Sequence, residues 1–60
     1  MNNYAIVFRT ISGSIIRFQA RSWSANGALL QAGDVTGWEI LALAECDSAD
    51  GAADFLAGWM

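Results

Sequence analysis

The chain contains no histidine and no lysine, and it has a single cysteine, Cys46. Histidine, lysine and activated cysteine are common general bases and nucleophiles, so their scarcity argues against an enzyme. One cysteine cannot form an internal disulfide, and the usual ligand sets for zinc are missing. We therefore expect no catalytic site, no bound metal and no other cofactor.

The remaining candidates for chemistry are weak. Glu39 and Glu45 fall on one face of a predicted strand, but at ~3.3 Å per residue they lie about 20 Å apart, too far for the carboxylate pair of a glycosidase. Cys46 stands between Glu45 and Asp47, whose charges oppose thiolate formation. We interpret it as an inert, small core residue.

Long hydrophobic runs are also absent. The longest near the middle of the chain covers residues 40–44, whereas a membrane span needs about 20 residues. No secretory signal pattern is visible, and a lone thiol suits a reducing compartment, so we expect a cytoplasmic location. Residues 1–60 form at most one domain. With 55% hydrophobic residues, the chain has more apolar surface than a small core can hide, which favours an interface.

Charge is divided along the chain. The basic residues all lie within the first 21 positions, the acidic residues all lie from position 34 onward, and the net charge is -3. They are Arg9, Arg17 and Arg21, against Asp34, Glu39, Glu45, Asp47, Asp50 and Asp54. Blocks of one sign select partners, so this pattern indicates binding rather than chemistry. The negative net charge argues against direct contact with nucleic acid or with an anionic membrane.

Hydrophobic periodicity predicts two strands at the start of the chain, residues 4–11 and 15–21, joined by the turn signal of residues 12–14. A three-residue loop would pair Ile11 with Ile15 and Phe8 with Phe18. One face is then apolar and the other mixed. The apolar face holds Tyr4, Ile6, Phe8, Phe18 and Ala20; the mixed face holds Ala5, Val7, Arg9, Arg17, Gln19 and Arg21.

A helix is predicted next, capped by Ser22 or Ser24 and ending at Gly33. Its apolar stripe is Ala25, Ala28, Leu29 and Ala32. A third strand follows over residues 38–46, with Trp38, Ile40, Ala42 and Ala44 beneath the helix, and Glu39, Leu41, Leu43 and Glu45 on the other face. Trp38 would close the core, and Trp23 would form a hydrophobic staple at the helix entry.

Ser48 is expected to cap a final helix over residues 49–58. Its apolar stripe is Ala52, Phe55, Leu56 and Trp59, opposite Asp47, Asp50 and Asp54. The prediction is an α+β fold of the order ββαβα, with a three-stranded antiparallel-type sheet ordered 2-1-3. The final helix either covers the second face of the sheet or lies beside it.

The candidate binding residues are the acidic set and one aromatic: Asp34, Glu39, Glu45, Asp47, Asp50, Asp54 and Trp59. The acids either face a basic groove of a partner or keep a hydrophobic small protein soluble. Trp59 belongs either to the core or to an interface. The strand order brings Glu39 beside Arg9, so charge neutralisation explains the arginines better than an RNA-binding sheet does.

Residues 20–45 combine Ala20-Arg21-Ser22, an Ala/Leu-rich helix and the segment Gly37-Trp38-Glu39-Ile40-Leu41-Ala42-Leu43-Ala44-Glu45. This stretch resembles the helix–strand half of small ββαβ proteins common in phages and mobile elements. The whole profile is similar to that of anti-CRISPR and other phage anti-defence proteins. That resemblance implies a protein that binds and blocks a host complex in the cytoplasm of a bacterial host, in some cases as a DNA mimic.

Two functions follow from these observations. The first is a non-enzymatic inhibitor whose acidic surface occupies a basic, nucleic-acid-binding groove of a host defence complex. The second is a homo-oligomeric structural module. Its simplest form is a homodimer in which apolar side chains pair across a two-fold axis: Val7, Ile15, Leu41 and Leu43. The two are compatible, because an inhibitor can itself be a dimer.

Overall fold

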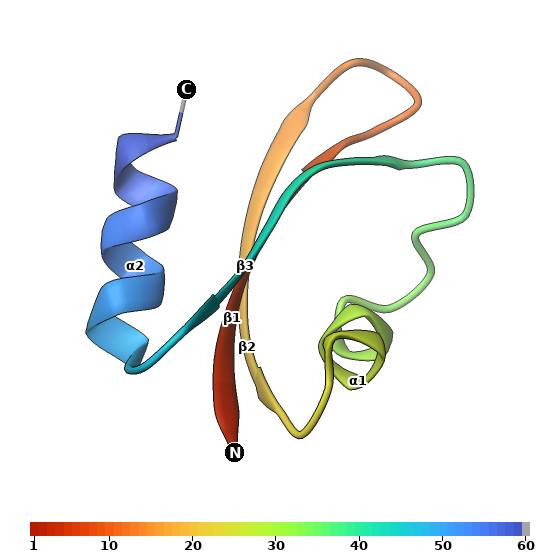
Figure 1. The fold of residues 1–60 in the computed structure, drawn as a ribbon. Helices are drawn as coiled ribbons and strands as arrows, with labels where there is room; N and C mark the ends of the chain where they lie inside the picture. Colours follow the sequence, from red (N-terminus) through yellow and green to blue (C-terminus); the bar gives the residue numbers. More distant parts are fainter. Residues whose placement is uncertain (60) are drawn as a thin grey trace.

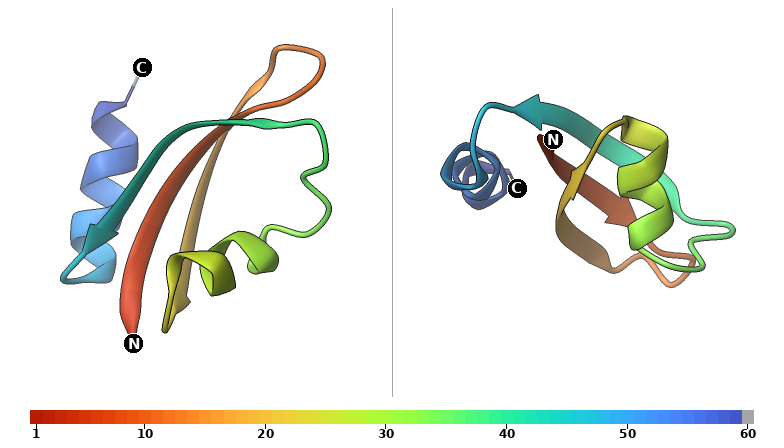
Figure 2. Two further views of the ribbon diagram at one scale, coloured as in Figure 1. Left: turned by 45° about the vertical axis from the view of Figure 1, so that its right-hand side comes forward. Right: turned by 90° about the horizontal axis from the view of Figure 1, so that it is seen from below.

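A three-stranded antiparallel sheet forms the centre of the molecule, with one helix on each of its faces (Figures 1 and 2). The computed structural model describes residues 1–59. Its elements are β1 (Asn2–Arg9), β2 (Ile15–Ser22), α1 (Ala25–Gln31), β3 (Glu39–Cys46) and α2 (Ala49–Gly58). The sheet order β2-β1-β3 and the ββαβα arrangement confirm the predicted α+β fold.

The hairpin between β1 and β2 has a longer loop than predicted. Arg9 pairs with Ile15 and Phe8 with Ile16, so residues 10–14 form the loop and the expected pairing of Phe8 with Phe18 is wrong. The Thr10 N–H donates to the Ser14 carbonyl at 2.9 Å, and the Ser14 N–H donates to the Thr10 hydroxyl at 3.1 Å. These polar contacts stabilise the wider loop. The register differs by two residues, which leaves every side chain on its predicted face.

A β-bulge in β3 overturns the predicted faces of that strand. Val7 pairs with Ala42 but Phe8 pairs with Ile40, so Leu41 is an extra residue. An extra residue reverses the alternation of side chains beyond it. Ile40 therefore shares the α1 face with Phe8, whereas Ala42 and Ala44 lie on the α2 face. The prediction that all four small and apolar residues lie beneath α1 was wrong.

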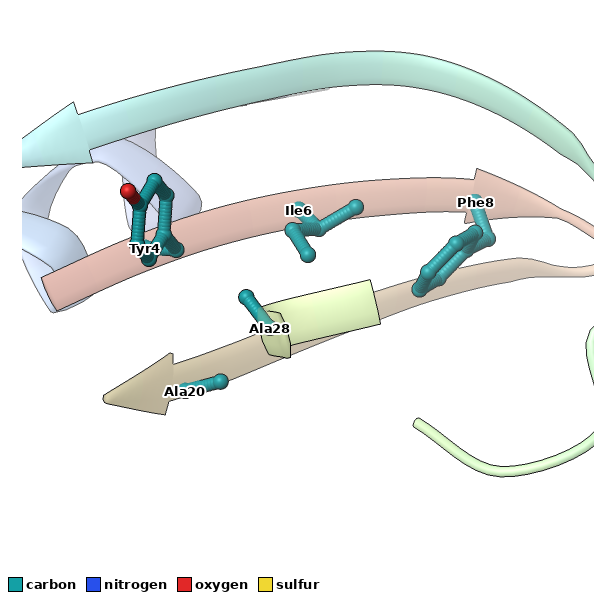
Figure 3. Close-up of a cluster of buried hydrophobic side chains, with 5 residues drawn as sticks. All are labelled: Tyr4, Ile6, Phe8, Ala20 and Ala28. Carbon is teal, nitrogen blue, oxygen red and sulfur yellow. The ribbon is translucent and has the colours of Figure 1, made fainter. Parts of the chain in front are cut away.

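The core on the α1 side consists of Tyr4, Ile6, Phe8, Ala20 and Ala28 (Figure 3). Trp38 packs against it, with its ring edge-on to Phe8 at a centroid distance of 5.6 Å, as predicted. Ser24 is the N-cap of α1 and accepts a hydrogen bond from the Gly27 N–H at 3.1 Å. Trp23 is 77% exposed, so the predicted staple is wrong: its partner position on the helix, Ala28, faces the sheet instead.

The core on the α2 side consists of Ala5, Val7, Ala52 and Leu56, with Leu41, Ala42, Cys46, Phe55 and Trp59 packed around it. The predicted cap at Ser48 is confirmed, since its hydroxyl accepts from the Gly51 N–H at 3.0 Å. The last helix therefore covers the second face of the sheet (Figure 1). Within residues 1–59, neither helix is long and apolar enough to span a bilayer.

Candidate functional site

Three acidic side chains lie together along the β3–α2 connection and α2, and we call them the α2 acidic surface: Asp47, Asp50 and Asp54. All three are exposed. Asp50 and Asp54 are one helical turn apart and so share a face. The buried residues of α2, Ala52 and Leu56, lie on the opposite side, against the sheet. The amphipathic spacing read from the sequence thus fixes which way these two carboxylates point.

Local helix chemistry explains part of this surface. Asp47 directly precedes the N-cap Ser48, and Asp50 lies in the first turn. Unpaired N–H groups give a helix N-terminus a partial positive charge, which favours carboxylates there. Asp54 lies a full turn further along, where this effect has faded. Helix stabilisation therefore accounts for two of the three acids, and Asp54 extends the negative surface beyond what the helix needs.

Two side chains of β2 hold α2 in position. The Arg17 guanidinium donates to the carbonyl of Trp59 at 2.9 Å, and the Gln19 amide donates to the carbonyl of Ala49 at 2.9 Å. The first contact places a cation at the C-terminus of the helix, where the helix dipole favours it. With the apolar stripe packed below, both ends of α2 are fixed to the sheet. The α2 acidic surface consequently sits on a rigid element.

The other predicted acids lie elsewhere. Glu39 accepts a hydrogen bond from Arg9 at 2.5 Å, beside the β1–β2 loop, which confirms the predicted proximity of these two residues. Glu45 pairs with Tyr4 and so lies on the α1 face. The expectation that Glu39 and Glu45 share a face was wrong, because the bulge separates them. The structure therefore distributes the predicted acidic set over several places.

Asp34 lies apart from the α2 acidic surface in the chain, in the loop that follows α1. Its carboxylate accepts a hydrogen bond from the Thr36 N–H at 3.0 Å. Hydrogen bonds from the Thr36 side chain and backbone lower the pKa of Asp34 below its usual value. This carboxylate thus shapes its own turn, as Asp commonly does in loops.

Trp59 takes the core position of the two that the sequence left open. It is the C-cap of α2 and is half-buried against the α2-side core. Its carbonyl is held by Arg17. The indole thus contributes to packing first, and only its outer part remains available to a partner.

The α2 acidic surface forms no ion pair within residues 1–59. Within residues 1–59, the one ion pair is that of Arg9 with Glu39. Arg17, the second arginine, is directed to a carbonyl. The arginine-bearing face of the sheet is covered by α2, which argues against the open RNA-binding sheet considered from the sequence. Glu45 and the α2 acidic surface therefore carry four negative charges that form no ion pair among the described residues, against one exposed arginine, Arg21, on the same sheet face as Arg17.

Two exposed apolar side chains of β3 were not predicted from the sequence. Ile40 and Leu43 are 48% and 40% exposed, although their sheet neighbours Phe8 and Ile6 are almost fully buried. The helix on this face, α1, has seven residues and packs over β2, so it leaves β3 uncovered. The predicted helix, capped by Ser22 or Ser24 and running to about Ala32, was already short, and α1 is shorter still, since its seven residues span only about 10 Å. The sheet face of Leu43 was predicted wrongly because no sign of the bulge is visible in the sequence.

In the described part of the chain, no pocket is present, and no three His, Cys, Asp or Glu side chains come together as metal ligands. Cys46 is half-buried and packs against the α2-side core. The candidate features that remain are two surfaces: a charged helix face and an apolar sheet edge.

No family model, curated protein or solved structure matches this chain. The resemblance to phage anti-defence proteins remains a prediction from sequence type, and it assigns no residue a role. Function must follow from the surfaces themselves.

Proposed function

We propose that this chain is a small non-enzymatic binding protein of the phage anti-defence, anti-CRISPR-like type. It acts in the cytoplasm of a bacterial host, on a complex that handles nucleic acid. The α2 acidic surface enters a basic groove of that complex and occupies the place of nucleic acid, as a DNA mimic does.

The observation that supports this proposal is the row of exposed carboxylates, none of them in an ion pair, on the outer side of a helix that is held at both ends. Grooves that hold nucleic acid are lined by Lys and Arg, which contact phosphates with little regard to sequence. A fixed row of carboxylates offers the same charge to those side chains. Because α2 is held at both ends, binding needs little further ordering of the helix.

The second function, a homo-oligomeric module, loses the interface that the sequence suggested for it. Val7 is fully buried and Leu41 packs under α2. Ile15 and Leu43 lie on opposite faces of the sheet, since their β1 neighbours Arg9 and Ile6 do. These four side chains cannot form one surface, so the inhibitor is the function that the geometry favours.

The experiment begins with a tagged pull-down from nuclease-treated bacterial lysate, with mass spectrometry of the retained proteins and stepwise elution by salt. The retained complex is then tested for binding to labelled DNA, with and without this protein. We expect release at high salt and loss of DNA binding when the protein is present, because the contact is electrostatic.

The variant Asp47→Lys, Asp50→Lys, Asp54→Lys should lose both effects while its circular dichroism spectrum stays that of a folded protein. The matched single variants Asp54→Lys and Asp34→Lys change the net charge equally, and only the first should weaken inhibition. Full activity of the triple variant would refute the acidic-surface mechanism. Equal weakening by both single variants would indicate net charge alone.

A further inference from the structure

The outer edge of β3 presents unpaired backbone groups. β3 is an edge strand. The hydrogen bond from the Thr10 N–H to the Ser14 carbonyl shows that the even-numbered residues of β1 direct their backbone N–H and C=O groups toward β2. In an antiparallel ladder, successive residues direct their N–H and C=O groups to alternate sides. The odd-numbered residues of β1 therefore bond to β3, through Ala42 and Ala44 among others. Leu43 and Glu45 consequently point their N–H and C=O groups away from the sheet.

Apolar rows cross the α1 face of the sheet and end open on β3. One row runs from Ile16 through Phe8 to Ile40, and the next from Phe18 through Ile6 to Leu43. The middle residues are buried, while Ile40 and Leu43 are exposed because α1 packs over β2. Figure 3 shows Ile6 and Phe8 of β1 between the two flanking strands. A further strand beside β3 would extend both rows.

The third row ends in a charge. Tyr4 pairs with Glu45, whose backbone also faces outward and whose carboxylate has no ion-pair partner within residues 1–59. Asp47 follows just beyond the strand, and β3 contains no Lys or Arg. We call Ile40, Leu43 and Glu45 the β3 edge strip. It combines backbone donors and acceptors, two apolar contacts and one negative charge along a single line.

We propose that the β3 edge strip binds an extended, cationic segment of a protein partner by strand addition. β1 places Tyr4, Ile6 and Phe8 opposite the strip at two-residue intervals, and a strand on the outer side repeats that spacing. The segment runs antiparallel to β3. From its N-terminus, its five residues are basic, any, apolar, any and apolar, so that the basic residue lies opposite Glu45 and the apolar ones lie opposite Leu43 and Ile40. This inference rests on the proposed function in one respect, that the partner is a protein, and it names the contact that would anchor it.

The acids of β3 select a foreign segment over a second copy. The β3 strand of a second copy contains no Lys or Arg, so it offers no cation to Glu45. Both copies would also bring a net charge of -3. The other edge strand is less open, because the Gln31 amide donates to the outward carbonyl of Arg21 at 2.6 Å. A basic segment meets neither obstacle at β3.

The test uses a fluorescein-labelled synthetic peptide with the core Arg-Thr-Val-Thr-Ile between threonine flanks, titrated with the intact protein and read by fluorescence anisotropy. We expect saturable binding. N-methylation of the peptide valine, whose N–H would bond to Leu43, should weaken binding about tenfold. N-methylation of the preceding threonine, whose N–H points away, should change little. Absence of binding, or equal effects of both methylations, overturns the proposal.

Protein variants test the same strip from the other side. Leu43→Pro removes only an outward N–H and an exposed side chain, so the ladder to β1 persists and peptide binding should be lost. Ile40→Thr should weaken binding, whereas Ile16→Thr, at the far end of the same row and similarly exposed, should not. Glu45→Lys should weaken the arginine peptide and favour one with aspartate in its place. Equal affinity of parent and Leu43→Pro contradicts strand addition.

Two further outcomes distinguish strand addition at β3 from binding through the α2 acidic surface and from self-association. At physiological salt, where distant charges are largely screened, Asp50→Lys, Asp54→Lys should weaken peptide binding far less than Glu45→Lys does, so loss of inhibition and loss of peptide binding report on different surfaces. A parent protein that is dimeric in solution, and monomeric as Leu43→Pro, would show that the strip binds a second copy and would overturn the proposal.

Discussion

The two faces of the sheet differ in how completely their helices cover them. α2 has ten residues, contacts all three strands and is fixed at both ends by Arg17 and Gln19. α1 has seven residues, includes Asn26 and Gly27, and packs over β2. The α2 face is therefore a closed layer, whereas the α1 face is closed on one side and open over β3.

This difference shows how a chain of 60 residues divides its apolar surface between stability and exposure. The α1 face holds the larger buried side chains, Ile6 and Phe8, yet it also exposes Ile40 and Leu43 in the same rows. A helix three residues longer would have more surface to hide them. The short helix leaves an apolar edge beside a sheet whose other face already carries the charged helix.

The largest expected effect compares two neighbours in one row. Ile6→Ala should lower the free energy of unfolding by about 2–5 kcal/mol, enough to unfold much of a domain of this size. Leu43→Ala should lower it by less than about 1 kcal/mol, because its side chain is already 40% exposed. Urea unfolding followed by tryptophan fluorescence measures both. A comparable loss for Leu43→Ala would mean that the face over β3 is closed.

A smaller change in stability is expected from replacing one glycine by alanine in each helix, and it differs between α1 and α2. Gly51→Ala should raise the free energy of unfolding by about 0.4–1 kcal/mol, since alanine favours a helix and its Cβ would meet only ordinary contacts. Gly27→Ala should give no gain, because the new Cβ would overlap the Ser22 hydroxyl oxygen. Thermal unfolding followed by circular dichroism measures both.

Ser22→Ala provides the control for that contrast. In its background the overlapping oxygen is gone, and Gly27→Ala should then be stabilising. If Gly27→Ala stabilises the parent protein as much as Gly51→Ala does, then the Ser22 hydroxyl rotates away or α1 shifts, and this overlap does not fix the position of α1.

The smallest effect concerns the loop that follows α1. Folding lowers the pKa of Asp34, so its contribution to stability is present above the unfolded pKa and is lost as the pH falls through the folded one. Thr36→Val removes the hydroxyl that is the first cause of the shift, and should raise the pKa of Asp34 toward its usual value. Thr36→Ser keeps the hydroxyl and serves as the control. Carboxyl-carbon NMR titration measures it, and an unchanged pKa in Thr36→Val would disprove this cause.

Short-range patterns predicted most of the fold. Ser48, the stripe from Ala52 to Trp59 and the stop at Gly33 were sufficient to place both helices, because caps and helical periodicity act within a few residues. Alternation in the first two strands assigned their faces correctly even with the loop mispredicted. The pairing of Arg9 with Glu39 followed from strand order alone.

The bulge at Leu41 was the feature that local patterns could not supply. Residues 38–46 alternate as an unbroken strand, and nothing in their own sequence requires an extra residue opposite Val7. One shift in register moved Leu43 to the α1 face and separated Glu39 from Glu45. The bulge therefore divided the two glutamates of the predicted acidic set between the two faces of the sheet.

By itself, the sequence determined the elements, their order and the division of charge, because these depend on neighbouring residues and on composition. Only the tertiary structure decided that α2 covers the second face, that Trp59 packs inward, and that Ile40, Leu43 and Glu45 align along an open edge. Those outcomes depend on how far each helix reaches across the sheet and on the register between β1 and β3. Both are set by contacts between residues distant in the chain, which no local pattern encodes.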